Sequence, residues 1–232
     1  MDEERSSREA LAAALRLAER FGLNEGICNH FSLQLADGRF LLSPHGIYWS
    51  QIRASDILVI EYDKPDNAAE VTALQIHGAI HHQHKHATCV LHTHMPWATA
   101  LTCVQNGQLQ YVHQNSLRFY DDVAYDQTYN GLADTAQEGQ RIASCMGDKR
   151  VLFLASHGVI VTGHTVAEAF DRLYYLERAC EVQVKAMSTG QPLRTIDQRL
   201  ARQTRAEFDA GASYATAHFD ALTQLLDTEY CD

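Results

Sequence analysis

The sequence has no hydrophobic run of about 18 residues, the length that a helix needs to cross a bilayer. Its first residues, MDEER, are acidic, whereas a secretory signal begins with a basic segment followed by an apolar one. Internal repeats, low-complexity runs and linkers are also missing. We therefore expect a cytoplasmic protein without membrane association, whose 232 residues form one large domain.

Basic residues are in the minority. Lys and Arg number 19 against 29 Asp and Glu, which gives a formal net charge of -10, and no basic cluster is visible along the chain. Because a protein that binds a phosphate backbone needs clustered Lys and Arg, nucleic acid is excluded as a predicted partner.

The cysteines lack the CxxC spacing of metal and redox motifs, and most have apolar neighbours. This pattern predicts buried free thiols in a reducing compartment. The six residues are Cys28, Cys89, Cys103, Cys145, Cys180 and Cys231.

Predicted helices and strands interleave along the chain, which favours an α/β or α+β fold with helices covering a mixed sheet. Side-chain caps are expected from Thr72, Asn130 and Thr165. The segment 111–129 has no clear period and is predicted as loop with short strands. Helices are expected over 8–21, 72–84, 96–103, 132–146, 165–190 and 196–228, and strands over 31–35, 39–42, 57–62, 88–92, 151–155 and 159–161.

Histidine is abundant, with 13 residues, and it is the commonest metal ligand. His92-Thr93-His94 follows an apolar strand, and residues two apart on a strand point the same way. His157 follows a second apolar strand and precedes Gly158. If these strand ends are neighbours, three neutral imidazoles can bind one divalent ion and leave positions open for substrate. Alternatively, both rings of His-Thr-His are simply hydrogen-bonded at a strand end, and the spacing alone does not decide.

A second group of histidines falls on one predicted helix, where His77 and His81 lie one turn apart. No HExxH carboxylate accompanies them, so we interpret the group as a packed or exposed helix face and not as a second metal site. It consists of His77, His81, His82, His84 and His86, while His164 and His218 are expected at the surface.

The stretches TCVLHTHMPWATA at 88–100 and VLFLASHGVIVTGHTVAEAF at 151–170 resemble the two halves of the signature of the class II aldolase/adducin family. The resemblance covers about residues 8–190, and residues 191–232 would form a helical tail of the same domain. It implies an α/β three-layer sandwich, in which helices flank a central, mainly antiparallel sheet. It also implies a homo-oligomer, usually a tetramer with active sites between subunits, and one divalent ion on His92, His94 and His157. Zinc is expected, with iron and manganese as alternatives.

The departures from the family pattern concern the substrate. Sugar-phosphate aldolases of the family carry a Glu where this chain has Ala73, and Glu70 is expected to lie too far away to replace it. Of their phosphate-binding residues, only Asn29, Ser32 and Thr72 remain. The stretches CNHFS, LLSPHGIYWSQI and TAL look instead like the adducin branch. We therefore expect a smaller anion, such as a carboxylate, bound by Asn29, His30, Ser43, His45 and the space beside Ala73.

These observations predict a metal-dependent carbon–carbon lyase that acts on a small, non-phosphorylated hydroxy- or oxo-acid. Without a base at position 73, decarboxylation is favoured over sugar-phosphate aldol cleavage, because loss of CO₂ needs mainly an electron sink. Candidate proton donors are Tyr120, Tyr125, Tyr129 and His113. The alternative is an adducin-like, non-catalytic binding or scaffold protein that keeps the metal site.

Overall fold

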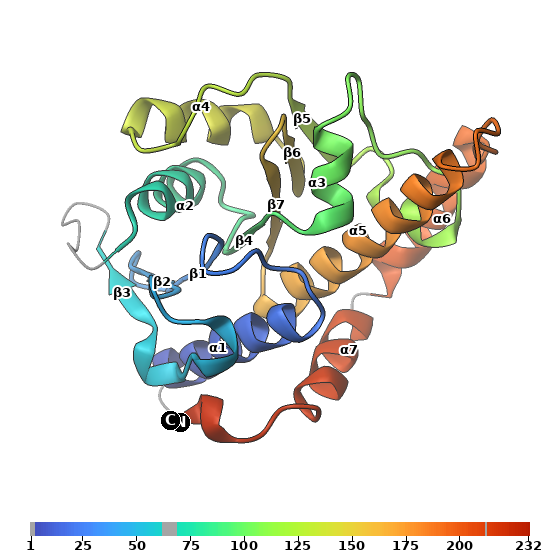
Figure 1. The fold of residues 1–232 in the computed structure, drawn as a ribbon. Coiled ribbons are helices and arrows are strands. Elements are labelled where there is room, and N and C mark those ends of the chain that lie inside the picture. Colours follow the sequence, from blue (N-terminus) through green and yellow to red (C-terminus); the bar gives the residue numbers. More distant parts are fainter. Residues whose placement is uncertain (1–2, 62–68, 212) are drawn as a thin grey trace.

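A computed structural model describes residues 3–61, 69–211 and 213–232. At its centre lies a seven-stranded sheet with the order β3-β2-β1-β4-β7-β6-β5 (Figure 1). All neighbouring strands are antiparallel except β5 and β6, which are parallel. The strands are β1 His30–Gln34, β2 Phe40–Leu42, β3 Leu58–Ile60, β4 Cys89–Thr93, β5 Val123–Asp126, β6 Val151–Leu154 and β7 Gly158–Gly163.

Helices cover both faces of the sheet (Figure 1). Strand alternation sends Leu91 of β4 into the core beneath one group of helices and Val90 into the core beneath the other. The predicted three-layer sandwich with a mainly antiparallel sheet is thus confirmed. One layer contains α1 Glu3–Arg20, α3 Pro96–Thr102 and α5 Val166–Met187, and the other contains α2 Val71–Gln83 and α4 Ala136–Met146.

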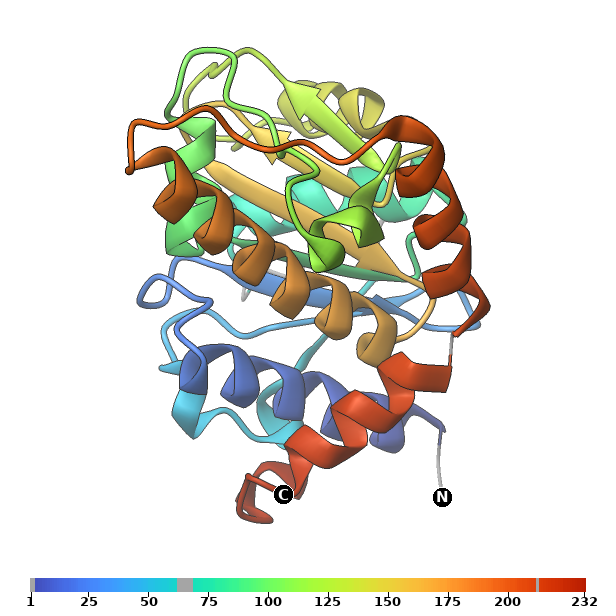
Figure 2. The same cartoon turned by 90° about the vertical axis from the view of Figure 1, so that its right-hand side faces the viewer.

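Two further helices follow α5 in the chain (Figure 2): α6 Gln198–Ala210 packs against the segment Gln114–Phe119, and α7 Ser213–Thr223 packs against α5. Phe219 of α7 packs edge-on against Phe170 of α5, with ring centroids 5.7 Å apart, so the C-terminal residues share the main core. Within the described residues, every helix is too short or too polar to span a bilayer. Short 3₁₀ helices are η1 Trp49–Gln51, η2 Ala54–Asp56, η3 Gln114–Phe119 and η4 Glu229–Cys231.

Two predicted helix starts are wrong. The cap of α2 is Glu70, whose carboxylate accepts a hydrogen bond from the Ala73 amide at 2.7 Å, because a charged acceptor serves the helix N-terminus better than the Thr72 hydroxyl. Helix α4 begins at Ala136 with Thr135 as its cap, since Asn130 instead donates to the Glu138 side chain. The predicted cap of α5 is confirmed, because Thr165 accepts from the Glu168 amide.

Other predictions are corrected in part. The segment 111–129 holds η3 and the edge strand β5, and Tyr62, the end of a predicted strand, lies outside the described residues. All six cysteines are free, and Cys89 and Cys180 are buried as expected. Cys28 and Cys103 are exposed, because one lies in the loop before β1 and the other at the C-terminal cap of α3.

Candidate metal centre

The structure brings His92, His94 and His157 together. His92 lies near the end of β4, His94 follows that strand, and His157 lies in the turn between β6 and β7. Because β4 pairs with β7, the two strand ends meet as the sequence required. Ring centroids are 4.8 Å apart for His92 and His157, 4.8 Å for His94 and His157, and 5.1 Å for His92 and His94. One ligand atom from each ring lies within 4.8 Å of the other two.

Hydrogen bonds fix which nitrogens face the centre. His92 donates from Nδ1 to the Val159 carbonyl at 3.0 Å, and His94 donates from Nδ1 to the Glu25 carboxylate at 2.8 Å. In a neutral ring of this kind Nε2 is unprotonated, and Nε2 of His94 is buried without a hydrogen-bond partner among the residues that the structure describes. A metal-binding imidazole has this arrangement: one ring nitrogen donates to an outer carboxylate or carbonyl, and the other nitrogen is left unpaired to bind the ion.

Burial also favours the neutral form of two of the three rings. Burial, reinforced by the neighbouring imidazoles, lowers the pKa of His92 well below its usual value. Burial and the nearby His94 lower the pKa of His157 to about 4. Only a neutral imidazole can donate its lone pair to a metal, so this group of histidines suits a divalent ion that prefers nitrogen ligands.

The turn that carries His157 is built for close approach. A Cβ added at Gly158 would lie 2.5 Å from the Thr93 carbonyl oxygen and 2.8 Å from a ring carbon of His94, so only glycine lets the two strand ends meet. Ser156, just before the histidine, has a φ of 54°, a strained value for a residue with a side chain.

All five residues predicted to bind substrate line one cavity of about 490 Å³ together with the three histidines. Asn29 accepts from the Glu25 amide through Oδ1, while its Nδ2 is buried without a partner and can donate to an anion. The Ser43 oxygen accepts from the Phe31 amide, which leaves its hydroxyl proton free. The five residues are Asn29, His30, Ser43, His45 and Ala73.

His30 differs from the prediction in its hydrogen-bonding role. We expected it to donate to an anion, but its Nδ1 is engaged with Nε2 of His77 at 2.7 Å. His77 and His81 are themselves buried, on the face of α2 that packs onto β1. Ser32 lies between these two rings and is fully buried, so it is not available to bind phosphate.

Of the four candidate proton donors, only Tyr129 lines the cavity, with its ring centroid 6.4 Å from that of His157. Tyr125 is on the side of β5 that faces away from this cavity. Its hydroxyl accepts a hydrogen bond from the Leu109 amide, and burial raises its pKa. Tyr120 stacks on Tyr111, and His113 precedes η3. Both lie at the ends of η3, in a segment whose sequence shows no clear period. Neither lines the cavity.

Glu70, which we expected to lie too far away to replace a base at position 73, is part of the site. As the cap of α2, it turns back toward the helix and lines the same cavity, so the predicted distance was wrong. Burial favours the neutral acid, but hydrogen bonds from the Thr72 hydroxyl and the Ala73 amide lower its pKa overall. The sequence does contain a sign of this role, since an acidic residue directly before a helix often caps it.

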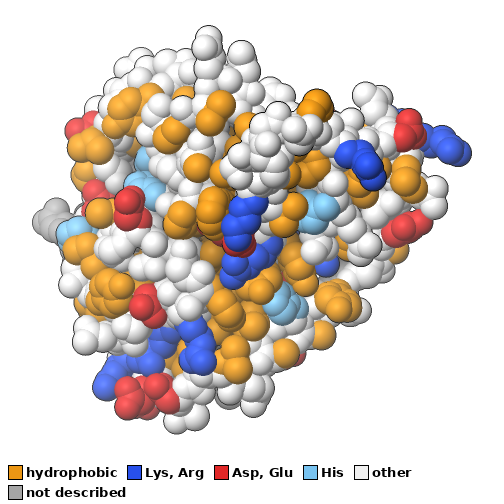
Figure 3. Space-filling model, turned by 45° about the vertical axis from the view of Figure 1, so that its right-hand side comes forward, with side chains coloured by type: hydrophobic (Ala, Val, Ile, Leu, Met, Phe, Trp, Pro, Cys, Tyr) orange, Lys and Arg blue, Asp and Glu red, His pale blue; other side chains and the backbone are white. Residues whose placement is uncertain are grey.

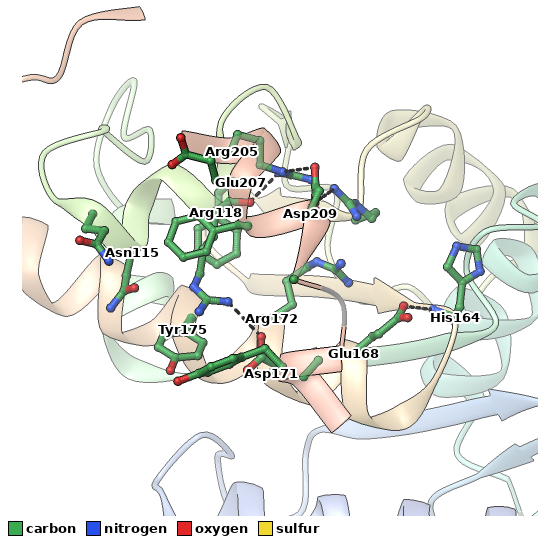
Figure 4. Close-up of a pocket in the computed structure, with 17 residues that line it drawn as sticks. Asn115, Arg118, His164, Glu168, Asp171, Arg172, Tyr175, Arg205, Glu207 and Asp209 are labelled. Atoms are coloured by element: carbon green, nitrogen blue, oxygen red, sulfur yellow. Dashed lines mark hydrogen bonds and ion pairs between the residues drawn. The ribbon is translucent and has the colours of Figure 1, made fainter. Parts of the chain in front are cut away.

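Basic residues that are far apart in the sequence come together in the fold. Four arginines from distant parts of the chain meet in a second cavity between η3, α5, α6 and α7 (Figure 4). Asp122 pairs with Arg150 at 2.7 Å and Arg205 at 3.1 Å, so carboxylates offset much of the charge. On the face drawn in Figure 3, basic and acidic side chains are interspersed, which does not make the uncompensated surface that nucleic acid needs. The arginines are Arg118, Arg150, Arg172 and Arg205.

Two predicted surface histidines lie near this second cavity. His164 is exposed, as expected. His218 is half-buried, because its Nδ1 donates to the Asp171 carboxylate at 2.7 Å.

The sequence of residues 9–184 matches the profile described as Class II Aldolase and Adducin N-terminal domain. A putative aldolase class 2 protein from Caulobacter vibrioides is 32% identical over 191 residues, which cover 79% of this chain and 74% of the relative. Human beta-adducin is 29% identical over 197 residues, which cover 81% of this chain but only 27% of the adducin.

Solved structures agree. An aldolase II superfamily protein from Pseudomonas syringae superimposes with a TM-score of 0.92 at 29% identity, covering 100% of this chain and 97% of the other. L-fuculose 1-phosphate aldolase from Glaciozyma antarctica PI12 gives a TM-score of 0.85 at 25% identity, covering 98% and 92%.

Proposed function

This chain belongs to the class II aldolase and adducin family, and on that premise we propose that it is a metal-dependent carbon–carbon lyase acting on a small, non-phosphorylated hydroxy- or oxo-acid. The observation that carries the proposal is the convergence of three imidazoles on a cavity in which Asn29 holds a donor that has no partner among the described residues. One divalent ion, zinc by preference and iron or manganese as alternatives, would be held by His92, His94 and His157.

A bound ion would supply a Lewis acid beside the substrate oxygens. The chain's own residues do the rest. Asn29 donates through Nδ2 to the carboxylate of the acid, and the Ser43 hydroxyl offers a second donor. Tyr129, which reaches over the cavity beside His157, is the residue we assign to return a proton to carbon.

The charges around the cavity argue against a phosphorylated substrate. Among the described residues that line it, none is Lys or Arg, whereas Glu70 contributes a carboxylate. Ser32 is committed to His77 and His81, and the Thr72 hydroxyl donates to Glu70 at 2.6 Å. Of the three phosphate-binding residues that the sequence retained, Asn29 alone has an unpartnered donor. A monoanionic carboxylate is therefore the better match.

The presence of Glu70 in the cavity removes the reason for preferring decarboxylase over aldolase chemistry. The preference for decarboxylation rested on the missing carboxylate at Ala73, and the cavity does contain a carboxylate one helical turn earlier in the chain. Retro-aldol cleavage of a hydroxy acid is therefore as well provided for as decarboxylation. The proposal covers carbon–carbon lyase chemistry as a class.

Exposed apolar residues support the proposed homo-oligomer. Ile27, Tyr129 and Leu132 line the cavity, yet they are 39%, 53% and 75% exposed. Such a rim favours burial against a second copy of the chain, as the tetramer implied by the family resemblance would provide. A small molecule as the partner, and a cytoplasmic location, stay predictions.

The second candidate is an adducin-like scaffold without catalysis. Ala73 at the position of the usual base, and the match to beta-adducin, favour it. A stoichiometric metal ion with turnover separates the two candidates, since a scaffold has no need of an open coordination site.

The experiment is metal analysis of chelator-free protein, followed by assay of a panel of 2-hydroxy and 3-oxo acids for release of CO₂ or an aldehyde. We expect one equivalent of metal per chain, turnover of at least one acid, loss of turnover with chelator, and negligible activity on fuculose or ribulose phosphates. Protein that is inactive on every acid, with or without bound metal, would support the scaffold. Strong activity on a sugar phosphate would refute the proposed substrate class.

A further inference from the structure

A buried chain of four hydrogen bonds runs from the metal cavity into the interior. It links His30 and Ser32 of β1 with His77 and His81 of α2, and it ends at the Ala87 carbonyl. Strand alternation places His30 and Ser32 on the α2 side of the sheet, while Phe31 points to the other core. The lengths are 2.7 Å for His30 to His77, 2.5 Å for His77 to Ser32, 2.7 Å for Ser32 to His81 and 2.9 Å for His81 to Ala87.

The carbonyl at the end determines the direction of every bond. A carbonyl can only accept, so Nδ1 of His81 carries the proton and its Nε2 accepts from the Ser32 hydroxyl. The Ser32 oxygen then accepts from Nδ1 of His77, which leaves Nε2 of His77 as an acceptor. That atom must receive its proton from Nδ1 of His30.

Reversing the direction of these hydrogen bonds would be energetically costly. If Ser32 donated to His77, both nitrogens of His81 would carry protons, and this buried ring would be an imidazolium. Burial lowers the pKa of His81 to about 4, so that form is scarce near neutral pH. None of the three rings in the chain has a hydrogen bond to a carboxylate of the described residues that could stabilise a charge.

Nε2 of His30 is consequently an unprotonated nitrogen at the cavity end of the chain. The His30 ring is only 6% exposed and has no hydrogen bond to a carboxylate of the described residues, which favours its neutral form. This nitrogen accepts no hydrogen bond from the described residues and stays accessible from the cavity that the ring lines. The ring centroid lies 4.8 Å from that of His92, so the lone pair is presented next to the metal ligands.

We propose that this hydrogen-bonded chain makes His30 a fixed acceptor, so that the cavity selects a hydroxy acid, whose hydroxyl donates to Nε2, over the oxo acid with the same skeleton. The inference rests on the proposed function and narrows its substrate class. Asn29, the preceding residue, offers a donor for the carboxylate, so donor and acceptor match the two ends of a hydroxy acid. An oxo group would place its lone pairs against that of Nε2, leaving a buried acceptor unpaired.

Binding to zinc-loaded protein tests the selection, with lactate, pyruvate and 2-methoxypropanoate as probes in calorimetry. We expect lactate to bind about tenfold or more tightly than the other two, the usual effect of leaving a buried acceptor unpaired. Ser32→Ala removes the acceptor of His77, frees its tautomer and should bring the three affinities within about twofold of one another. Ser32→Thr keeps the hydroxyl and should keep the selectivity, as should the control His84→Gln, whose ring is hydrogen-bonded to the Ala143 carbonyl and lies beside that of His86.

Nitrogen-15 NMR of histidine-labelled, metal-free protein reads the tautomers directly. Protons on Nδ1 of His30, His77 and His81 are expected, and a proton on Nε2 of His30 overturns the proposal even if the protein proves to be a lyase. Equal binding of lactate and pyruvate by the unmodified protein also overturns it. Expected tautomers with no binding of any acid would instead count against the proposed function as well as the selection.

Discussion

His30 and His92 face each other directly across the antiparallel pair β1 and β4, with ring centroids 4.8 Å apart. One is predicted to hold the metal, and the other ends the hydrogen-bonded chain from α2. Because they share one register position, any shift of β1 against β4 would separate substrate recognition from the metal.

His92→Ala, His94→Ala and His157→Ala are each expected to abolish metal binding, because two imidazoles leave an incomplete ligand set. The measurement is metal content after purification, with circular dichroism to confirm folding. His84→Ala is the control, since this ring lies on the far side of α2 and bonds to Ala143. A full equivalent of metal in any of the three variants would refute the assignment.

Glu25→Gln should weaken metal affinity by about tenfold without removing a ligand. The Glu25 carboxylate accepts from Nδ1 of His94 and so fixes the tautomer that exposes Nε2, and losing such an outer partner typically costs tenfold or more. Competition with a fluorescent zinc chelator measures the affinity. Glu19→Gln, on α1, serves as a charge-matched control, and an equal effect of both changes would mean that Glu25 acts only through its charge.

Gly158→Ala should destabilise the fold by about 1–3 kcal/mol and disturb the metal site, because the new methyl group overlaps the Thr93 carbonyl. Urea unfolding and metal affinity are measured together. Gly211→Ala is the matched control, since its nearest neighbour would be at 3.5 Å, an ordinary contact. Unchanged zinc affinity in Gly158→Ala would show that the close approach of the strand ends is not required.

The metal-free protein should lose stability as the pH falls from 7 to 5. His81 has its folded pKa lowered by burial from 6.5 to about 4, so below pH 6.5 the unfolded chain binds a proton that the native ring does not. This stabilisation is complete above pH 6.5 and is lost as the pH falls toward 4. His81 alone should account for about 2 kcal/mol between pH 7 and 5.

Urea unfolding at both pH values, with chelator present to remove metal effects, measures this loss. His81→Gln should reduce the pH dependence by about the same amount, because the uncharged amide does not titrate. A pH dependence identical to that of the unmodified protein would show that His81 is not held neutral in the fold.

The sequence by itself predicted the three histidines that converge at the proposed metal site, because the position of each at a strand end follows from short-range rules. Strand alternation points His92 and residues two positions away to one side, and the turn before Gly158 fixes His157 close to a strand end. Most strands, and the helices with strong period and caps, follow from the same local rules, as does the layered fold that their alternation implies.

Only the tertiary structure decided how the other functional groups meet. Glu70 reaches the cavity through its capping bond to Ala73, and Ser32 becomes a link between two histidines because β1 packs beneath α2. Arg118 and Arg205 converge although they are far apart in the chain. These contacts arise from strand pairing and helix packing between distant segments, and no periodicity within a single segment encodes them.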